Sequence, residues 1–240
     1  MPIVGLDRER GFALIAEMNS TRNLLAYGLR VLRTAAFVET TRDPILTMLS
    51  IGVEKLYKLT LGIVALDRDQ AWPSAQETMA WGHKLDEMHE AVMAELRVRT
   101  ADTSEHVRAR FAGVEADPVV EPVIEALDMY GRRGRFFFLD LLGEKPQSWV
   151  GPDAAWQKIE SAALADPAVA TLYSATTTNV GDNDIWADFV AGLNERIALA
   201  VEQLWTMVAV CGRNHALGET GVVFGFEVHP GAVGRQVSGR

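Results

Sequence analysis

The strongest constraint on the fold is the segment PILTMLSIGVEKLYKLTLGIVAL (44–66), which is apolar on almost every side of a helix. A helix with so little polar surface is normally buried, either in a membrane or among other helices. Its length would suit a membrane span, but Glu54, Lys55 and Lys58 lie at its middle. Each charge there would cost about 2.5–3.5 kcal/mol on membrane-insertion scales. We therefore expect a buried central helix in a soluble, cytoplasmic protein that does not enter a membrane.

Helical periodicity also dominates the chain around this segment, since apolar residues recur at three- and four-residue spacing. Proline and glycine punctuation divides the pattern into further predicted helices, at about 20–43, 82–99, 121–142 and 181–208. Asp43-Pro44 resembles an N-cap followed by proline in the first turn, so we expect the central helix to begin there. The sequence thus predicts an all-α, single-domain helical bundle over residues 1–218.

The composition changes after Gly218. Residues 219–240 contain TGVVFGFEVHPGAVGR, in which β-type residues alternate with glycines. This pattern is typical of a short strand or an extended segment, and the last residues of a chain are often poorly ordered. We therefore predict an extended or partly disordered C-terminal arm over 219–240.

Overall charge and cysteine content narrow the classes of function. The net charge of −9 argues against a general polyanion-binding protein, because such proteins usually carry a basic face. The single cysteine, Cys211, excludes an internal disulfide framework, and its place in an apolar helix favours a packing role over a nucleophilic one. No cofactor motif is present, and none is expected.

A narrow polar strip runs along the otherwise apolar central helix, through Thr47, Ser50, Glu54 and Lys58. Glu54 and Lys58 are four residues apart in the favourable order, so they can form an ion pair. One interpretation is a thin solvent-exposed stripe, or an internal ion pair that fixes packing. The other is a polar pocket within the bundle, lined by Glu54 and Lys58 and completed by neighbouring helices.

The segment MAWGHKLDEMHE (79–90) places two of the five histidines among acidic residues. On a helix, His83, Glu87 and Glu90 would share one face, whereas His89 would flank the opposite, apolar stripe. A histidine and carboxylates at this spacing can bind a divalent metal, but only with further ligands from another helix. Because no second metal-ligand motif exists, we expect no metal site and interpret this face as solvated and acidic.

The densest positive cluster lies in DMYGRRGRFFFLD (128–140), where Arg132, Arg133 and Arg135 stand beside aromatic residues. An arginine next to aromatic rings can bind a phosphate or stack on a base. The alternative is that the arginines pair with acidic residues of neighbouring helices. We favour this alternative for Arg133 and keep Arg132 and Arg135 as candidate ligand-binding residues.

Three short motifs in this order resemble those of the HEPN superfamily of helical-bundle proteins. They are GVEKLYKLTLGI (52–63), GHKLDEM (82–88) after a Trp-Pro break, and RRGRFFFLDLL (132–142), so the resemblance covers about residues 20–142. The family pattern has a lysine in the first element, a histidine and a leucine in the second, and Arg-Tyr in the third. The corresponding residues here are Lys58, His83, Leu85, Arg135 and Phe136, while Lys84 departs from the family's usual aspartate.

The resemblance implies two functions. Many members are metal-independent ribonucleases of toxin–antitoxin or defence systems, with a histidine four to six residues after the arginine. No histidine follows Arg132, Arg133 or Arg135 at that distance. Members that lack it resemble binding or assembly modules, which are often homodimers. We therefore expect a binding module for a protein partner or a nucleotide or RNA ligand, with Glu54, Lys58, His83, Arg132 and Arg135 as its candidate ligand-binding residues.

Two enzymatic alternatives stay open. The first is a ribonuclease with a noncanonical site, in which His83 or His89 replaces the missing histidine beside Arg135. The candidate catalytic residues are then Arg135 and His83. The second is a metal-dependent helical-bundle enzyme, which depends only on His83 with Glu87 and Glu90.

Overall fold

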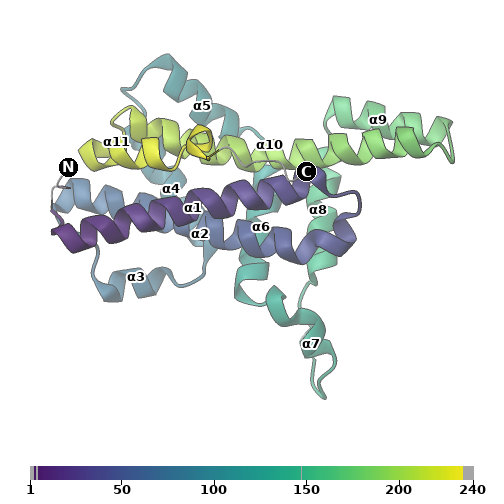
Figure 1. Cartoon of the computed structure of the whole chain (residues 1–240), viewed down its shortest axis with the longest axis horizontal. Helices are drawn as coiled ribbons and strands as arrows, with labels where there is room; N and C mark the ends of the chain where they lie inside the picture. Colours follow the sequence, from purple (N-terminus) through teal and green to yellow (C-terminus); the bar gives the residue numbers. More distant parts are fainter. Residues whose placement is uncertain (1–2, 4, 147, 235–240) are drawn as a thin grey trace.

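The computed structural model describes residues 3, 5–146 and 148–234, and this part of the chain is helical with no strand. The prediction of an all-α bundle is therefore confirmed (Figure 1). The elements are α1 (Arg8–Thr34), α2 (Val38–Asp69), α3 (Ala75–Trp81), α4 (Leu85–Arg99), α5 (Glu105–Glu115), α6 (Val120–Arg132), η1 (Gly134–Phe136), α7 (Phe137–Leu141), α8 (Pro152–Leu164), α9 (Pro167–Thr178), α10 (Asn183–Arg213), α11 (Gly218–Glu227) and η2 (Pro230–Ala232).

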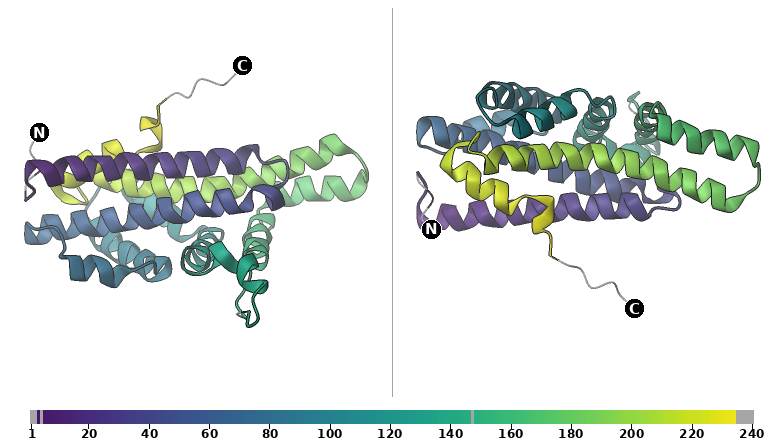
Figure 2. Two further views of the ribbon diagram at one scale, coloured as in Figure 1. Left: turned by 60° about the horizontal axis from the view of Figure 1, so that its bottom comes forward. Right: turned by 90° about the horizontal axis from the view of Figure 1, so that it is seen from above.

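Helix α2 is the central helix that the sequence predicts. It packs against α1, α4, α6, α10 and α11, and its Leu56, Tyr57 and Ile63 are fully buried. The long helices α1, α2 and α10 lie alongside one another, while α9 and the first part of α10 project together beyond them (Figure 2). Within the described residues, no helix is both long enough and apolar enough to span a membrane.

The first two long helices separate earlier than the sequence predicts. The break was expected at Asp43-Pro44, but it lies at residues 35–37, and Pro44 is inside α2. A tertiary contact holds the break there, because the buried side-chain amide of Asn194 donates to the Ala35 carbonyl over 3.0 Å. Pro44 is exposed, so water can hydrate the carbonyl that its ring leaves without a helical donor.

The arginine-rich segment is not the single helix predicted over 121–142. Helix α6 ends at Arg132, and the chain continues as η1 and the short α7. Gly134 is buried against the last turn of α6, where an added Cβ would lie 3.0 Å from the Tyr130 ring. This close approach lets the chain bend, and it leaves Phe136 68% exposed instead of on an apolar helix face.

The C-terminal segment corrects a second prediction, since α11 occupies the start of the expected extended arm (219–240). Its glycines are contact residues. A Cβ on Gly212 would lie 2.5 Å from the Gly221 carbonyl oxygen, and one on Gly225 would lie 2.4 Å from a carbonyl oxygen of α10. Glycine therefore allows α10 and α11 to pack backbone to backbone. The glycine-rich composition of this segment indicates an extended chain instead. The last predicted arm residues, 235–240, lie outside the described residues.

Candidate functional site

The structure brings three of the predicted site residues together. On α2, the Lys58 ammonium donates to Glu54 Oε1 over 2.8 Å. The Nδ1 atom of His83 lies 3.0 and 3.1 Å from the two oxygens of the same carboxylate. Burial would raise the pKa of Glu54, but hydrogen bonds from Lys58 and His83 outweigh it and hold that pKa below its ordinary value. The carboxylate is thus ionised and shared by two donors.

The sequence predicts that His83 lies on a helix, but the structure places it in a turn, from which it reaches Glu54. It lies in the link between α3 and α4, where Gly82 has a φ of 53° that favours glycine. His83 therefore does not share a helix face with Glu87 and Glu90, and Glu87 pairs with Lys84 over 3.0 Å. The described chain has no group of three or more His, Cys, Asp or Glu side chains that could hold a metal ion. The metal-dependent alternative thus loses the helix face on which it depended.

A second set of charges adjoins this turn and centres on Asp128 of α6, which the sequence reasoning missed. Lys84, at the N-cap position of α4, makes no side-chain capping bond. Instead, buried Asp128 accepts a hydrogen bond from the Leu85 backbone N–H over 2.8 Å. A residue far along the chain thus provides an acceptor for a free N–H group in the first turn of α4. Arg132 donates to Asp128 over 2.9 and 2.5 Å and lies 3.2 Å from Asp86.

The two aspartates of this set differ in their pKa. Burial raises the pKa of Asp128, although Arg132 and the Leu85 N–H oppose the rise. Burial acts in the same direction on Asp86, but the hydrogen bond from the Glu87 N–H and the charge of Arg132 help to hold its pKa below the ordinary value. A usable sequence signal existed, because Asp128 lies on the apolar face of α6 and four residues before Arg132.

Arg135 stands apart from these residues. It lies exposed on η1, and no hydrogen bond or ion pair of its side chain occurs within the described residues. Its charge reaches Tyr130, where it opposes the pKa increase that burial causes. His89 is also engaged elsewhere, 2.6 Å from the Tyr57 hydroxyl, and burial lowers its pKa to about 4. Neither His83 nor His89 is hydrogen-bonded to Arg135.

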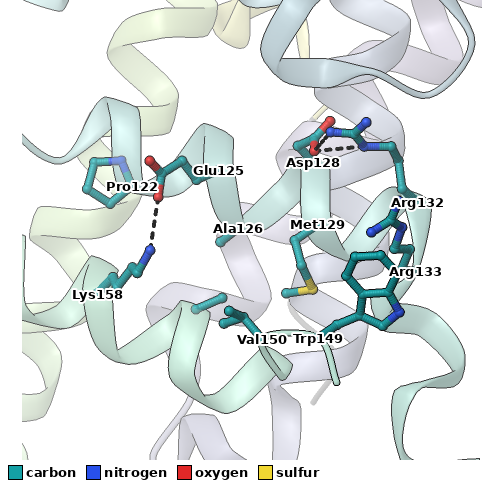
Figure 3. Close-up of a pocket in the computed structure, with 11 residues that line it drawn as sticks. Pro122, Glu125, Ala126, Asp128, Met129, Arg132, Arg133, Trp149, Val150 and Lys158 are labelled. Carbon is teal, nitrogen blue, oxygen red and sulfur yellow. Dashed lines mark hydrogen bonds and ion pairs between the residues drawn. The ribbon is translucent and has the colours of Figure 1, made fainter. Parts of the chain in front are cut away.

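A pocket of about 270 Å³ adjoins Asp128 and Arg132, between α6, α8 and the segment before α8 (Figure 3). Its wall consists of Pro122, Glu125, Ala126, Asp128, Met129, Arg132, Arg133, Trp149, Val150, Ala155 and Lys158. The Arg133 guanidinium carbon lies 3.5 Å from the centre of the Trp149 ring. The sequence interpretation of Arg133 as a partner of acidic residues is therefore wrong, and Trp149 was missed because it lies in a polar loop.

The charged side chains of this pocket differ in whether they form ion pairs. Lys158 pairs with Glu125 over 3.4 Å, and Arg132 pairs with Asp128. Within the described chain, Arg133 has no carboxylate at ion-pair distance, so its contact with the indole ring is its main interaction. Arg133 is therefore the cation of this pocket that remains open to an anion.

The one cysteine offers no nucleophile. Cys211 is fully buried in α10, and burial raises the pKa of its thiol to about 12. The thiolate that nucleophilic chemistry requires is therefore absent at neutral pH. This agrees with the packing role that the sequence predicts.

Comparison with known proteins gives no match, whether to a family model, a curated protein or a solved structure. The helical bundle is compatible with a HEPN-like fold, and this agreement concerns the fold class alone. Function is therefore inferred from the geometry of the pocket and the charged residues beside it.

Proposed function

We propose that this protein is a HEPN-like module that binds a nucleotide-type ligand in the pocket of Arg133 and Trp149, without ribonuclease chemistry. The observation that carries the proposal is the Arg133 guanidinium, stacked 3.5 Å over the Trp149 ring in a pocket. An indole ring provides a face on which any base can stack. A guanidinium without a carboxylate partner provides a planar donor fork for phosphate.

The size of the pocket favours a small ligand. Its volume of about 270 Å³ lies just below the usual range for ligand pockets, roughly 300–1,000 Å³. That space suits one base with one phosphate better than a dinucleotide. The net charge of −9 also disfavours a long polyanion, so a mononucleotide or a single exposed nucleotide is the favoured ligand.

The ribonuclease alternative requires a histidine and an arginine that act together on one phosphate. The arginine of that alternative is Arg135, which is exposed, but His83 is bonded to Glu54 and His89 to Tyr57. Both candidate histidines therefore already have a partner within the chain, and neither is hydrogen-bonded to Arg135. A binding role needs no free acid–base pair, and it is therefore the better supported of the two.

The proposal includes a homodimer formed through the segment after α6. Five large apolar side chains are exposed there, namely Phe136, Phe138, Leu139, Leu141 and Leu142. Clustered apolar side chains at a surface are typical of interaction sites. We expect Leu139→Glu to shift the sedimentation coefficient towards that of a monomer, and a wild-type protein that is monomeric at high concentration would contradict this part of the proposal.

Isothermal titration calorimetry with AMP, GMP and inorganic phosphate tests the ligand proposal. We expect the nucleotides to bind more tightly than phosphate, because only they can stack on Trp149. Arg133→Gln and Trp149→Leu should each weaken nucleotide binding about tenfold. Lys145→Gln is the matched control, since it removes an exposed positive charge outside the pocket. Equal binding by all variants, or no binding of either nucleotide at millimolar concentration, would contradict the proposal.

A further inference from the structure

A second pocket, of about 500 Å³, lies between the start of α2, helix α8 and the first part of α10. This is where the α1–α2 turn meets the base of the projecting α9–α10 pair (Figure 1). None of its residues lines the pocket of Arg133 and Trp149, so it is a separate site.

Three aromatic side chains form walls of this pocket. Trp186 and Phe189 of α10 have ring centres 5.5 Å apart and planes inclined by 59°. Phe37, from the α1–α2 turn, is 67% exposed. Its turn is fixed to α10 by the buried hydrogen bond from Asn194 to the Ala35 carbonyl. The aromatic surfaces therefore belong to a turn and a helix that are held together.

Two carboxylates, Glu160 and Glu39, share the pocket with these rings. The indole N–H of buried Trp156 donates to Glu160 Oε1 over 2.9 Å and so orients it. Within the described residues, neither carboxylate forms an ion pair, and Arg42, whose charge acts on Glu160, is paired with Asp153.

The environment of Glu160 disfavours its negative charge. Burial raises the pKa of Glu160, and the charge of Glu39 acts in the same direction. The hydrogen bond from Trp156 and the charge of Arg42 oppose the rise without cancelling it. A cation placed between the two carboxylates would compensate both of them.

We infer that this pocket binds a small organic cation, an ammonium ion with apolar substituents. Aromatic faces attract such cations, and they do so more strongly when the site is partly desolvated. The carboxylates of Glu160 and Glu39 supply the opposite charge, and no cationic side chain lines the described pocket. The volume of about 500 Å³ lies within the usual range of small-molecule sites. An anion is disfavoured by the two carboxylates, and a neutral apolar molecule would leave them uncompensated.

Choline and its neutral carbon isostere, 3,3-dimethyl-1-butanol, test this inference as a matched pair of probes. Each is titrated into the full-length protein while the indole N–H resonances are followed by NMR. The Trp186 resonance is assigned with Trp186→Phe, and the Trp156 resonance with Trp156→Phe. We expect choline to shift the resonances of both, and the alcohol to shift them at least about fivefold less at the same concentration.

Substitutions locate the binding. Glu160→Gln and Glu39→Gln should each weaken choline binding about fivefold to tenfold. Glu39 is exposed, so its variant keeps the test valid even if Glu160→Gln alters the fold. Glu9→Gln, which removes an exposed carboxylate from α1, should leave binding unchanged. Equal binding of choline and the alcohol, or choline binding that neither pocket substitution weakens, would overturn the inference.

Discussion

The carboxylates near the start of α4 and those in the pocket between α2, α8 and α10 meet different neighbours. Asp128 accepts a backbone N–H and pairs with Arg132, and Glu54 is shared by Lys58 and His83. Within the part of the chain that the structure describes, Glu160 accepts only an indole N–H, and it lies near a second carboxylate. Among the described residues, carboxylates of one bundle thus have cationic partners in one region and lack them in another.

The largest effect is expected at Asp128. Asp128→Ala leaves the Leu85 N–H at the α4 start without its acceptor and removes the main partner of Arg132. Breaking a buried pair costs several kcal/mol, and partial exposure of Arg132 reduces this to about 3 kcal/mol of unfolding free energy. Urea unfolding measures the loss. Asp86→Ala is the control and should cost less than about 1 kcal/mol, because its pair with Arg132 is more exposed. Equal losses would show that burial does not distinguish the two aspartates.

The second effect is a dependence of stability on pH, which comes from a partly buried histidine whose partner is neutral. His89 is bonded to Tyr57 OH, and its folded-state pKa of about 4 lies below the ordinary value of 6.5. The unfolded chain therefore binds the proton first, so stability should fall by about 3 kcal/mol as the pH drops from about 6.5 to about 4. His89→Gln should reduce this slope in urea unfolding at several pH values. His215→Gln, at an exposed site, should preserve it, and an unchanged slope in His89→Gln would refute the assignment.

A smaller effect is expected at Glu54. Glu54→Gln removes the charge that Lys58 and His83 share, and because both partners are partly exposed the cost should be about 1 kcal/mol. Since the pKa of Glu54 is lowered in the folded state, its contribution is present above the unfolded-state pKa and is lost as the pH falls. Urea unfolding at neutral and acidic pH measures both. A Glu54→Gln variant as stable as the wild type at neutral pH would remove Glu54 from the set of stabilising charges.

The smallest effect should have the opposite sign. Glu160→Gln removes a partly buried charge that has no cationic partner among the described residues, and it keeps an oxygen for the Trp156 N–H. We expect the unfolding free energy to stay constant or to rise by about 0.5 kcal/mol at neutral pH. Glu219→Gln, at an exposed position of α11, serves as the control in the same urea series. A loss above about 1 kcal/mol would place Glu160 with the stabilising carboxylates and end the contrast between the two regions.

Features that repeat along one helix could be predicted from the sequence. The central helix α2 and the Glu54–Lys58 pair follow from local spacing, and both are present. The positions that escaped prediction depend on segments far apart in the chain. Asp128 caps a helix that begins 43 residues earlier, and Trp149 is part of the pocket because its ring contacts Arg133. The glycines of α11 have a clear role only when α10 lies against them.

RNA cleavage in EDTA is the most direct test of a binding module that lacks ribonuclease chemistry. Purified wild-type protein is incubated with a single-stranded RNA, with Arg135→Ala and His83→Ala beside it. We expect intact RNA in all three reactions, because neither His83 nor His89 is hydrogen-bonded to Arg135 and both histidines have other partners. Cleavage by the wild type that is lost in either variant would contradict the account and establish a ribonuclease with a rearranged site.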